Sequence, residues 1–241
     1  MADRYFVDRP ITGDQARLSG AEAHHLTHVM RAVAGDEVVL FDGSGAEFTA
    51  RIERVGRSEI ELAMVSRSVI DREARVAVTL GVALPKGDRQ RWLVEKAAEL
   101  GVARLVPLVT ERSNQRESAA GLEKLRRAVI EASKQCGRNR LLEIAAPEPL
   151  EDFLGAAARA DCRLVAHPNG HPLSRVLDEL AVADPQSVAL AIGPEGGFSA
   201  AEIERAVAQG WQRVDLGQRI LRVETAALAL VAAVLGRVAG G

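Results

Sequence analysis

The stretch Val188-Ala189-Leu190-Ala191-Ile192-Gly193-Pro194-Glu195-Gly196-Gly197-Phe198 passes from an unbroken apolar segment straight into a glycine-rich turn. Such an apolar run is typical of a strand that is buried on both faces, as in a parallel sheet covered by helices. Ser199-Ala200-Ala201-Glu202 follows and has the form of a helix capping box. Open α/β sheets bind ligands beyond the carboxyl ends of their strands, so this turn is a candidate binding loop. The alternative is an ordinary strand-to-helix turn in which glycine relieves backbone strain.

A second glycine-marked turn, Leu216-Gly217-Gln218-Arg219-Ile220-Leu221-Arg222-Val223-Glu224-Thr225, lies near the carboxyl end of the chain. It follows a predicted strand at 211–216 and leads into a predicted helix at 224–238. Glycine turns let a flat ligand approach the main chain, whose amide and carbonyl groups can recognise the edge of an adenine ring. We expect the two turns to form two halves of one ligand pocket.

A third candidate loop, Val165-Ala166-His167-Pro168-Asn169-Gly170, follows a predicted strand at 162–166. Taken alone, His167 is equally well explained as a loop histidine or a helix cap. Convergence of all three strand-end loops at one edge of a sheet would favour a binding role.

Residues 73–241 alternate apolar strand-like runs with amphipathic helix-like stretches, the pattern of a parallel sheet covered by helices. This pattern begins after the charged stretch at 70–75. Asp88 is the predicted N-cap of one helix, and Gly101 is the glycine that ends it. The predicted strands are 75–84, 103–109, 162–166, 188–192 and 211–216, and the predicted helices are 88–100, 122–136, 173–180, 199–209 and 224–238. We therefore predict an α/β domain at 73–241.

Residues 1–72 consist of short apolar pieces separated by turn residues. Glu37–Phe41, Asp42-Gly43-Ser44-Gly45 and Glu47–Ile52 predict a hairpin. Glu59–Val65 alternates charged and apolar residues, as expected of a strand with one face in water. The pattern predicts a small β-barrel domain at 1–72.

One amphipathic helix is predicted at 19–31, within the barrel domain. Ser19 and Glu22 fit a Ser-x-x-Glu capping box. The apolar face of the predicted helix consists of Leu26, Val29 and Met30. We expect this helix to cross the barrel.

The composition of the 241-residue chain is that of a globular protein, with 47% hydrophobic and 27% charged residues, which excludes unfolded and fibrous classes. Aromatic residues make up only 3%, so binding of single-stranded nucleic acid by a row of stacked bases is poorly supported. The formal net charge is −2, but 31 Lys and Arg residues leave room for a local basic face. An acidic or nucleic-acid partner remains open.

Cys136 and Cys162 have neither the spacing of a disulfide framework nor that of a metal site. No secretory leader is recognisable before Tyr5, and we expect a reduced, cytoplasmic protein. The apolar run at 226–235 is shorter than the roughly 18 residues that span a bilayer, so no membrane association is expected. We interpret it as a buried core helix or a face that meets another subunit.

Several common catalytic motifs are absent from the sequence. No Gly-x-Gly-x-x-Gly joins a strand to a helix, and no Gly-x-x-x-x-Gly-Lys-Ser/Thr is present, which disfavours NAD binding and nucleotide hydrolysis. A Gly-x-Ser-x-Gly nucleophile elbow and clusters with metal-ligand spacing are also missing. We therefore expect neither hydrolase chemistry nor a metal.

Six segments in a fixed order carry a resemblance to a known family. The segments are His24-His25-Leu26 to Arg31, Pro85–Arg89, Glu95–Val102, Gln135–Arg140, Ile192–Phe198, and Leu216-Gly217 with Ile220–Ala226. Each segment is weak by itself, whereas six in the family's order are very specific. In these segments the chain resembles the 16S (small-subunit) ribosomal RNA uridine-N3 methyltransferases of the SPOUT superfamily, and the resemblance spans nearly its whole length.

The resemblance implies a PUA-like, RNA-binding β-barrel at 1–72 and a SPOUT α/β methyltransferase domain at 73–241. In such a domain the carboxyl-terminal segment threads a loop to make a deep trefoil knot, a rare exception to the rule against threading. The resemblance also implies a homodimer with a site at or near the subunit interface.

The cofactor implied by the resemblance is S-adenosylmethionine, held in a bent form by the knot loops and released as S-adenosylhomocysteine. The residues expected to bind it are Leu164, Ala166, His167, Pro168, Ile192, Gly193, Pro194, Glu195, Gly196, Gly197, Leu216, Gly217, Ile220 and Leu221.

Methylation of uracil N3 requires removal of the N3 proton or stabilisation of the anion at O2 and O4. Arg222 is expected to stabilise that charge, and Glu224 or Glu195 is expected to act as the base or to orient Arg222. The alternative for both carboxylates is that they complement the amino termini of helices.

The implied partner is 16S ribosomal RNA, free or within the 30S subunit, recognised as a folded surface with one flipped base. Phosphate contacts are expected to hold it. His24 and His28 share a helix face without a third metal ligand, so packing and RNA contact are favoured over zinc. The candidate RNA-binding residues are Arg4, Arg9, His24, His25, Arg31, Lys86, Arg89, Arg138, Asn139 and Arg140.

Three other functions remain open. They are a SPOUT-like methyltransferase with another RNA target, a non-catalytic RNA-binding or assembly factor, and an unrelated small-molecule α/β enzyme. Cofactor binding separates the second from a methyltransferase, and salt-sensitive RNA affinity argues against the third.

Overall fold

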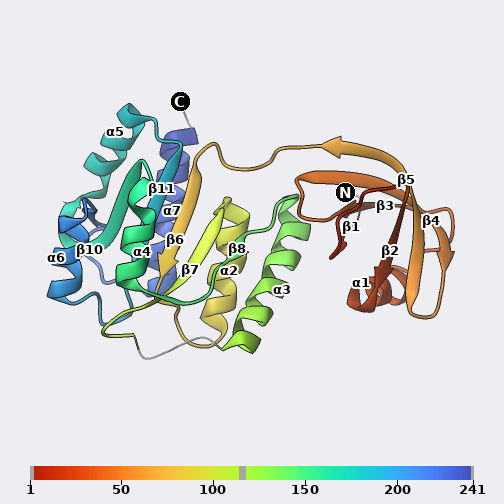
Figure 1. Ribbon diagram of the computed structural model, residues 1–241, viewed down its shortest axis with the longest axis horizontal. Helices are drawn as coiled ribbons and strands as arrows, with labels where there is room; N and C mark the ends of the chain where they lie inside the picture. Colours follow the sequence, from red (N-terminus) through yellow and green to blue (C-terminus); the bar gives the residue numbers. More distant parts are fainter. Residues whose placement is uncertain (1–2, 114–117, 240–241) are drawn as a thin grey trace. The chain divides into compact units, whose positions relative to one another are not determined.

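The computed structural model describes residues 3–113 and 118–239 and divides into two compact units (Figure 1). The first comprises Met1–Glu73 together with Ile130–Leu141, and the second comprises Ala74–Val129 together with Leu142–Gly241. The sequence pattern changes near the end of the first segment, but it contains no sign that residues 130–141 belong with the first unit.

The first unit contains a five-stranded sheet with the strand order β1-β3-β4-β5-β2. Its strands are β1 (Arg4–Phe6), β2 (Gln15–Ser19), β3 (Glu37–Phe41), β4 (Ala46–Val55) and β5 (Glu59–Val69). β3 and β4 pair antiparallel, with Glu37 opposite Arg51, which confirms the predicted hairpin. Gly43 and Gly45 in its turn have φ of 84° and 97°, a region that glycine enters without steric cost.

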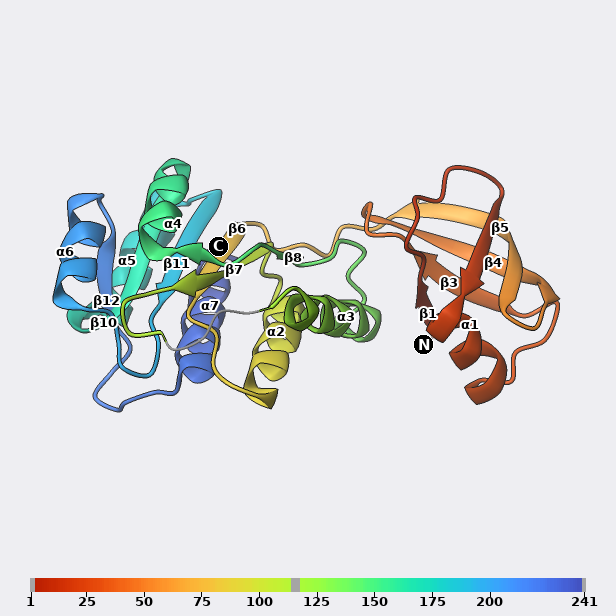
Figure 2. The ribbon, with the colours of Figure 1, turned by 60° about the horizontal axis from the view of Figure 1, so that its bottom comes forward.

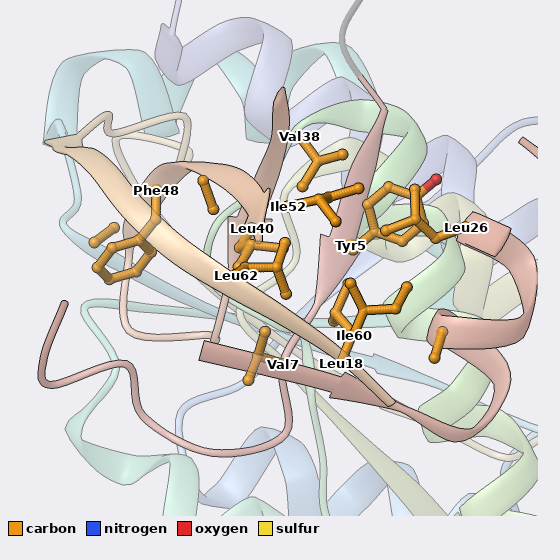
Figure 3. Packing of buried hydrophobic residues seen from close by; sticks show 13 residues of the cluster. Tyr5, Val7, Leu18, Leu26, Val38, Leu40, Phe48, Ile52, Ile60 and Leu62 are labelled. Carbon is orange, nitrogen blue, oxygen red and sulfur yellow. The ribbon is translucent and has the colours of Figure 1, made fainter. Parts of the chain in front are cut away.

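An apolar cluster forms the core of the first unit (Figure 3). Alternate residues of the strands contribute to it, because successive side chains of a strand point to opposite faces. The residues labelled in the figure are Tyr5, Val7, Leu18, Leu26, Val38, Leu40, Phe48, Ile52, Ile60 and Leu62.

The helical segment after β2 is more irregular than predicted. α1 (Gly20–His24) passes directly into one π-helical turn, η1 (His25–Val29). Val29, the last residue of this turn, and Met30 after it are 60% and 42% exposed. Of the predicted apolar face only Leu26 is buried.

The capping box predicted at the start of this helix is wrong. Ser19 is the N-cap residue, but its side chain makes no capping hydrogen bond. The Glu22 carboxylate is engaged elsewhere, because it accepts hydrogen bonds from Lys134 Nζ at 3.0 and 3.2 Å. A tertiary ion pair has replaced the local interaction.

The second unit contains a parallel sheet with the strand order β12-β10-β11-β6-β7-β8, and β9 also pairs with β7. Its strands are β6 (Ala77–Val82), β7 (Arg104–Val109), β8 (Glu143–Ile144), β9 (Glu148–Pro149), β10 (Cys162–Pro172), β11 (Ser187–Ile192) and β12 (Gln212–Asp215). The pairings of β6, β10, β11 and β12 are all parallel, which confirms the predicted α/β class.

Helices cover both faces of this sheet, and Figure 2 shows α4 on one side and α2 with α7 on the other. α4 packs against α6, while α7 packs against α2 and α5. The helices are α2 (Asp88–Leu100), α3 (Ala119–Cys136), α4 (Leu150–Ala156), the 3₁₀ turn η2 (Ala157–Arg159), α5 (Leu173–Ala183), α6 (Ala200–Ala208) and α7 (Val223–Ala239). α3 begins in the second unit and ends in the first.

The predicted helix ends agree with the structure in part. The capping box at Ser199 is confirmed, since Ser199 N–H donates to the Glu202 carboxylate at 2.7 Å and Glu202 N–H donates to Ser199 Oγ at 3.3 Å. Gly101 ends α2 in the left-handed region. The prediction for Asp88 is wrong, because Gly87 is the N-cap and Asp88 lies in the first turn, where its charge suits the helix dipole.

Glu47 of β4 lies between two guanidinium groups of the first unit. It accepts hydrogen bonds from Arg4 Nη1 at 2.8 Å and from Arg72 Nη1 at 3.1 Å. Burial pushes the pKa of Glu47 upward, but the hydrogen bonds and attraction of the two arginines outweigh burial and hold the pKa below its ordinary value.

Acidification should therefore destabilise the first unit partly through Glu47. A carboxyl with a lowered pKa in the folded state contributes stability that is present above its unfolded pKa and is lost as the pH falls through its folded pKa. We expect the urea midpoint to fall as the pH is lowered below the ordinary pKa of a glutamate, and to fall less steeply in Glu47→Gln. Equal pH dependence in the two proteins would contradict this role.

Candidate functional site

The carboxyl ends of β10, β11 and β12 border a pocket of about 400 Å³ in the second unit. Most of its wall comes from three segments, which are residues 166–168, 192–198 and 214–221. Val223 and Ala226 add part of α7. The pocket thus lies where open α/β sheets bind ligands, and its volume is typical of a small-molecule site.

Most residues predicted to bind the cofactor line this pocket. They are Ala166, His167, Pro168, Ile192, Gly193, Pro194, Glu195, Gly196, Gly197, Leu216, Gly217, Ile220 and Leu221. Leu164 is not part of the wall, because it lies inside β10 with its side chain in the core. The wall also contains Phe198, Gln218, Arg219 and Val223, which belong to the two turns expected to form a pocket but are not among the residues assigned to the cofactor. It further contains residues that the sequence does not single out: Arg112, Val214, Asp215 and Ala226.

The loop at 193–198 is tightly packed within itself at Gly193. A Cβ at Gly193 would lie 3.1 Å from the Phe198 main-chain nitrogen, so a side chain there would force the turn to shift. Arg112 Nη1 donates to the Gly196 carbonyl at 2.9 Å and fixes the other end of the turn. Arg112 comes from the segment after β7, which has no glycine or turn signature to mark it.

The loop predicted after residue 166 is an irregular continuation of β10. The strand extends to Pro172, and both Ala166 and His171 are paired with Val214, so residues 167–170 bulge from the ladder. His167 Nδ1 in this bulge is buried and has no hydrogen-bond partner among the described residues. Such an atom on a pocket wall fits a polar group of a bound ligand.

The predicted catalytic carboxylates lie on either side of Arg89. Arg89 Nη2 is 3.5 Å from Glu195 Oε1, and Arg89 Nη1 is 3.7 Å from Glu224 Oε2. Glu195 lines the pocket, whereas Glu224 is buried in the first turn of α7 and is not a wall residue. Arg222 is exposed and also lies outside the wall. The structure therefore groups the two carboxylates around Arg89 rather than around Arg222.

The predicted RNA-binding residues fall into two groups. Arg9, His24, His25, Arg31, Lys86 and Arg140 are exposed. Arg138 and Asn139 are only 3% and 2% exposed, which does not fit their predicted role as phosphate ligands. Arg4 is also mostly buried and donates to Glu47 and Asn139. Arg89 is half-buried in its ion pairs with the two carboxylates.

Arg138 and Asn139 instead fasten the end of α3 to the rest of the first unit. Arg138 is ion-paired with Glu73, with its Nε donating at 3.1 Å. Asn139 Oδ1 accepts from Arg4 Nη2 at 2.6 Å, and Asn139 Nδ2 donates to the Ile70 carbonyl at 3.2 Å. These long-range pairings bury Arg138 and Asn139, so neither side chain is available to a phosphate.

Within the described ranges, no three His, Cys, Asp or Glu side chains are grouped as metal ligands would be. The helices of the same ranges include none with the length and apolarity needed to cross a bilayer.

Comparison with known families assigns both parts of the chain. Residues 72–235 match the RNA methyltransferase domain family, and residues 18–65 match the RNA methyltransferase PUA domain family. Among curated proteins, the ribosomal RNA small subunit methyltransferase E of Synechocystis is 34% identical over 90% of this chain and 73% of its own. The protein of the same name from Bacillus subtilis is 27% identical over 96% and 95% of the two chains.

Solved structures agree with this assignment. A Legionella pneumophila protein, described as a methyltransferase with bound cofactor SAM, is 33% identical over 98% of each chain, with a TM-score of 0.89. A ribosomal RNA small subunit methyltransferase E of Neisseria gonorrhoeae bound to S-adenosyl methionine is 29% identical over 97% and 96% of the chains, with a TM-score of 0.87. The chain belongs to the ribosomal RNA small subunit methyltransferase E family.

Proposed function

We propose that this protein methylates N3 of one uridine in 16S ribosomal RNA, with S-adenosylmethionine as the methyl donor and the assembled 30S subunit as the substrate. The observation that carries the proposal is the 400 Å³ pocket bounded by three strand-end loops. Its walls include every residue that the family resemblance assigns to the cofactor except Leu164. The related structures with bound S-adenosylmethionine support the same ligand.

The pocket residues fit such a cofactor. Gly193–Gly197 line the pocket, and His167 Nδ1 offers a buried polar atom with no hydrogen-bond partner among the described residues. When bound, the cofactor supplies the methyl carbon: N3 forms the new C–N bond, the C–S electron pair stays on sulfur, and S-adenosylhomocysteine and the N3 proton are released.

Glu195 is the residue that we propose as acceptor of the N3 proton, because it is the predicted carboxylate on the pocket wall. Arg89 would orient Glu195, and buried Glu224 would hold Arg89 in place through their 3.7 Å approach. Arg222 follows the wall residue Leu221 and is exposed, so we propose that it meets the negative charge of the substrate.

The RNA is proposed to contact exposed basic residues by its phosphates. In the first unit these are Arg9, His24, His25, Arg31 and Arg140. Arg31 has φ of 57°, the left-handed region that is uncommon for a residue with a side chain. Such a strained, exposed position two residues after η1 supports a binding role.

A trefoil knot is proposed for the second unit. β12 is the edge strand of the sheet, yet α7, which follows it, packs against β6 and β11. Residues 216–222 must therefore cross from that edge past neighbouring strands, as a threaded segment would. A crystal structure can test this proposal. If joining the two ends of its backbone gives a closed curve without a knot, the proposed knot is wrong.

A homodimer in the cytoplasm is also proposed. The apolar run at 226–235 is buried in part within its own unit, with Ala227, Leu230 and Val231 at 0% exposure. The apolar surface left for another subunit includes Trp92 and Ile220, which are 46% and 100% exposed. Light scattering that reports one chain per particle at micromolar concentration would contradict the dimer.

The decisive experiment supplies methyl-labelled S-adenosylmethionine with three substrates: 30S subunits, free 16S RNA, and free 23S RNA as the control. The first two come from cells that lack uridine-N3 methylation of 16S RNA. We expect label at one uridine N3, with 30S subunits preferred. Label on another base or RNA would indicate a different methyltransferase specificity. Cofactor binding without label on any RNA would contradict the proposed substrates, and absence of cofactor binding would favour a non-catalytic role.

A further inference from the structure

A second, smaller cavity lies beside the first in the same unit. It measures about 180 Å³ and shares Arg112, Pro194, Glu195 and Gly196 with the wall of the larger pocket. The rest of its wall is Ala83, Leu84, Lys86 and Ser113. The turn around Pro194 thus borders both cavities.

We propose that this cavity receives the uracil ring of the target nucleotide, with Lys86 and Arg112 contacting its carbonyl oxygens. The inference rests on the proposed methyl transfer, which requires an acceptor site directly beside the donor site. The cavity has less than half the volume of its neighbour, which suits one ring rather than a nucleoside joined to an amino acid.

The charges on the wall match the chemistry of uracil. Neutral uracil presents an N3–H donor between two carbonyl oxygens, and loss of the N3 proton leaves a negative charge spread over N3, O2 and O4. Glu195 is an acceptor for the proton, and Lys86 and Arg112 are cations for the oxygens. Cytosine has no N3–H and carries an amino group in place of one carbonyl, so the same wall disfavours it.

The positions of these groups are partly fixed before substrate binds. Arg112 is anchored because its Nη1 donates to the Gly196 carbonyl at 2.9 Å. Glu195 is 3.5 Å from Arg89, and Arg89 also approaches buried Glu224. Groups held in this way need less reorganisation as charge develops on the ring, which is how anion-stabilising sites accelerate reactions.

Lys86 offers the cleaner test, because Arg112 also fixes the wall of the larger pocket. We expect Lys86→Met to lower kcat on the substrate RNA by about a hundredfold, the usual cost of one anion-stabilising group. The affinity for S-adenosylhomocysteine, measured by calorimetry, should stay within about twofold. Lys86→Arg should retain most activity, since it keeps the positive charge. Lys124→Met makes the same change on an exposed part of α3 and should leave kcat unchanged.

A substrate analogue separates charge stabilisation from a structural effect. RNA that carries 5-fluorouridine at the target position has a more acidic N3, so its anion depends less on the protein. The loss caused by Lys86→Met should shrink on this RNA. A loss of equal size on both RNAs, or a matching loss of S-adenosylhomocysteine affinity, would overturn the assignment.

A binding measurement distinguishes this inference from the proposed function. Uridine 5′-monophosphate is titrated into full-length protein saturated with S-adenosylhomocysteine and followed by NMR. We expect uridine 5′-monophosphate to bind Lys86→Met more weakly than wild-type protein and to bind Lys124→Met equally well. Cytidine 5′-monophosphate should bind wild-type protein more weakly than uridine 5′-monophosphate. These results would support the cavity as the uracil site. If wild-type protein methylates its RNA but Lys86→Met changes neither binding nor turnover, the cavity is not the uracil site, whereas the proposed methyl transfer stands. If wild-type protein labels no RNA and binds no uridine monophosphate, both fail.

Discussion

Replacement of Arg138 by alanine is expected to lower the free energy of unfolding by about 3 to 5 kcal/mol, because it breaks a buried ion pair and leaves one partner behind. Arg138 is 3% exposed and pairs with Glu73 within the first unit. The carboxylate that remains would have lost the partner that compensates for its partial burial. Urea denaturation followed by circular dichroism measures the loss.

Arg140→Ala is the matched control two residues further along the same turn. Arg140 is exposed, so its removal should change stability by no more than about 0.5 kcal/mol. If Arg140 binds a phosphate, its variant should lower the slope of log affinity against log salt by about 0.9. Arg138→Ala protein that is still folded should show the wild-type slope of log RNA affinity against log salt, because Arg138 is buried and meets no phosphate. A reduced slope in Arg138→Ala with unchanged stability would restore Arg138 as an RNA ligand.

The second large effect is expected for Gly170→Ala, with a loss of about 1 to 3 kcal/mol from overpacking. A Cβ at residue 170 would lie 2.8 Å from the main-chain nitrogen and carbonyl carbon of Val214 in β12. Backbone cannot rotate away as a side chain can, so the β10 bulge or β12 must move. For a chain of this size each kcal/mol lowers the Tm by roughly 2 to 4 °C.

Because that bulge carries His167 to the pocket, Gly170→Ala should also weaken S-adenosylhomocysteine binding. Gly155→Ala in α4 is the control, since a Cβ there meets nothing within 4 Å and alanine favours a helix. Calorimetry and thermal melting of both variants give the comparison. Unchanged melting of Gly170→Ala would contradict the close approach of the two strands.

The pocket could be predicted because its signals are local. The apolar run that ends at Ile192 and the glycines after it are adjacent in the sequence, and parallel strands bring their carboxyl ends to one edge. The capping box at Ser199 is likewise contained in four residues. Leu164 was assigned to the same site by resemblance, but it points into the core of the unit rather than into the pocket.

The features of the fold and of the site that could not be predicted depend on interactions between residues that are distant in the sequence. Arg112 reaches Gly196 across 84 positions, and Arg4 reaches Asn139 across 135. Ser19 has the sequence of a cap but lacks the interaction, because Glu22 pairs with Lys134. A local pattern cannot reveal which of two competing partners a charged side chain will meet in the folded chain.

The first unit is discontinuous, and this has a consequence for its synthesis on the ribosome. Residues 3–73 emerge first, but Lys134, Arg138 and Asn139, which pair with Glu22, Glu73 and Arg4, come more than fifty residues later. Until then three charged groups of the nascent amino-terminal segment lack their counterparts. The unit that begins the chain therefore reaches its final stability only after a large part of the next unit has been translated, so the order of synthesis is not the order in which the two units are completed.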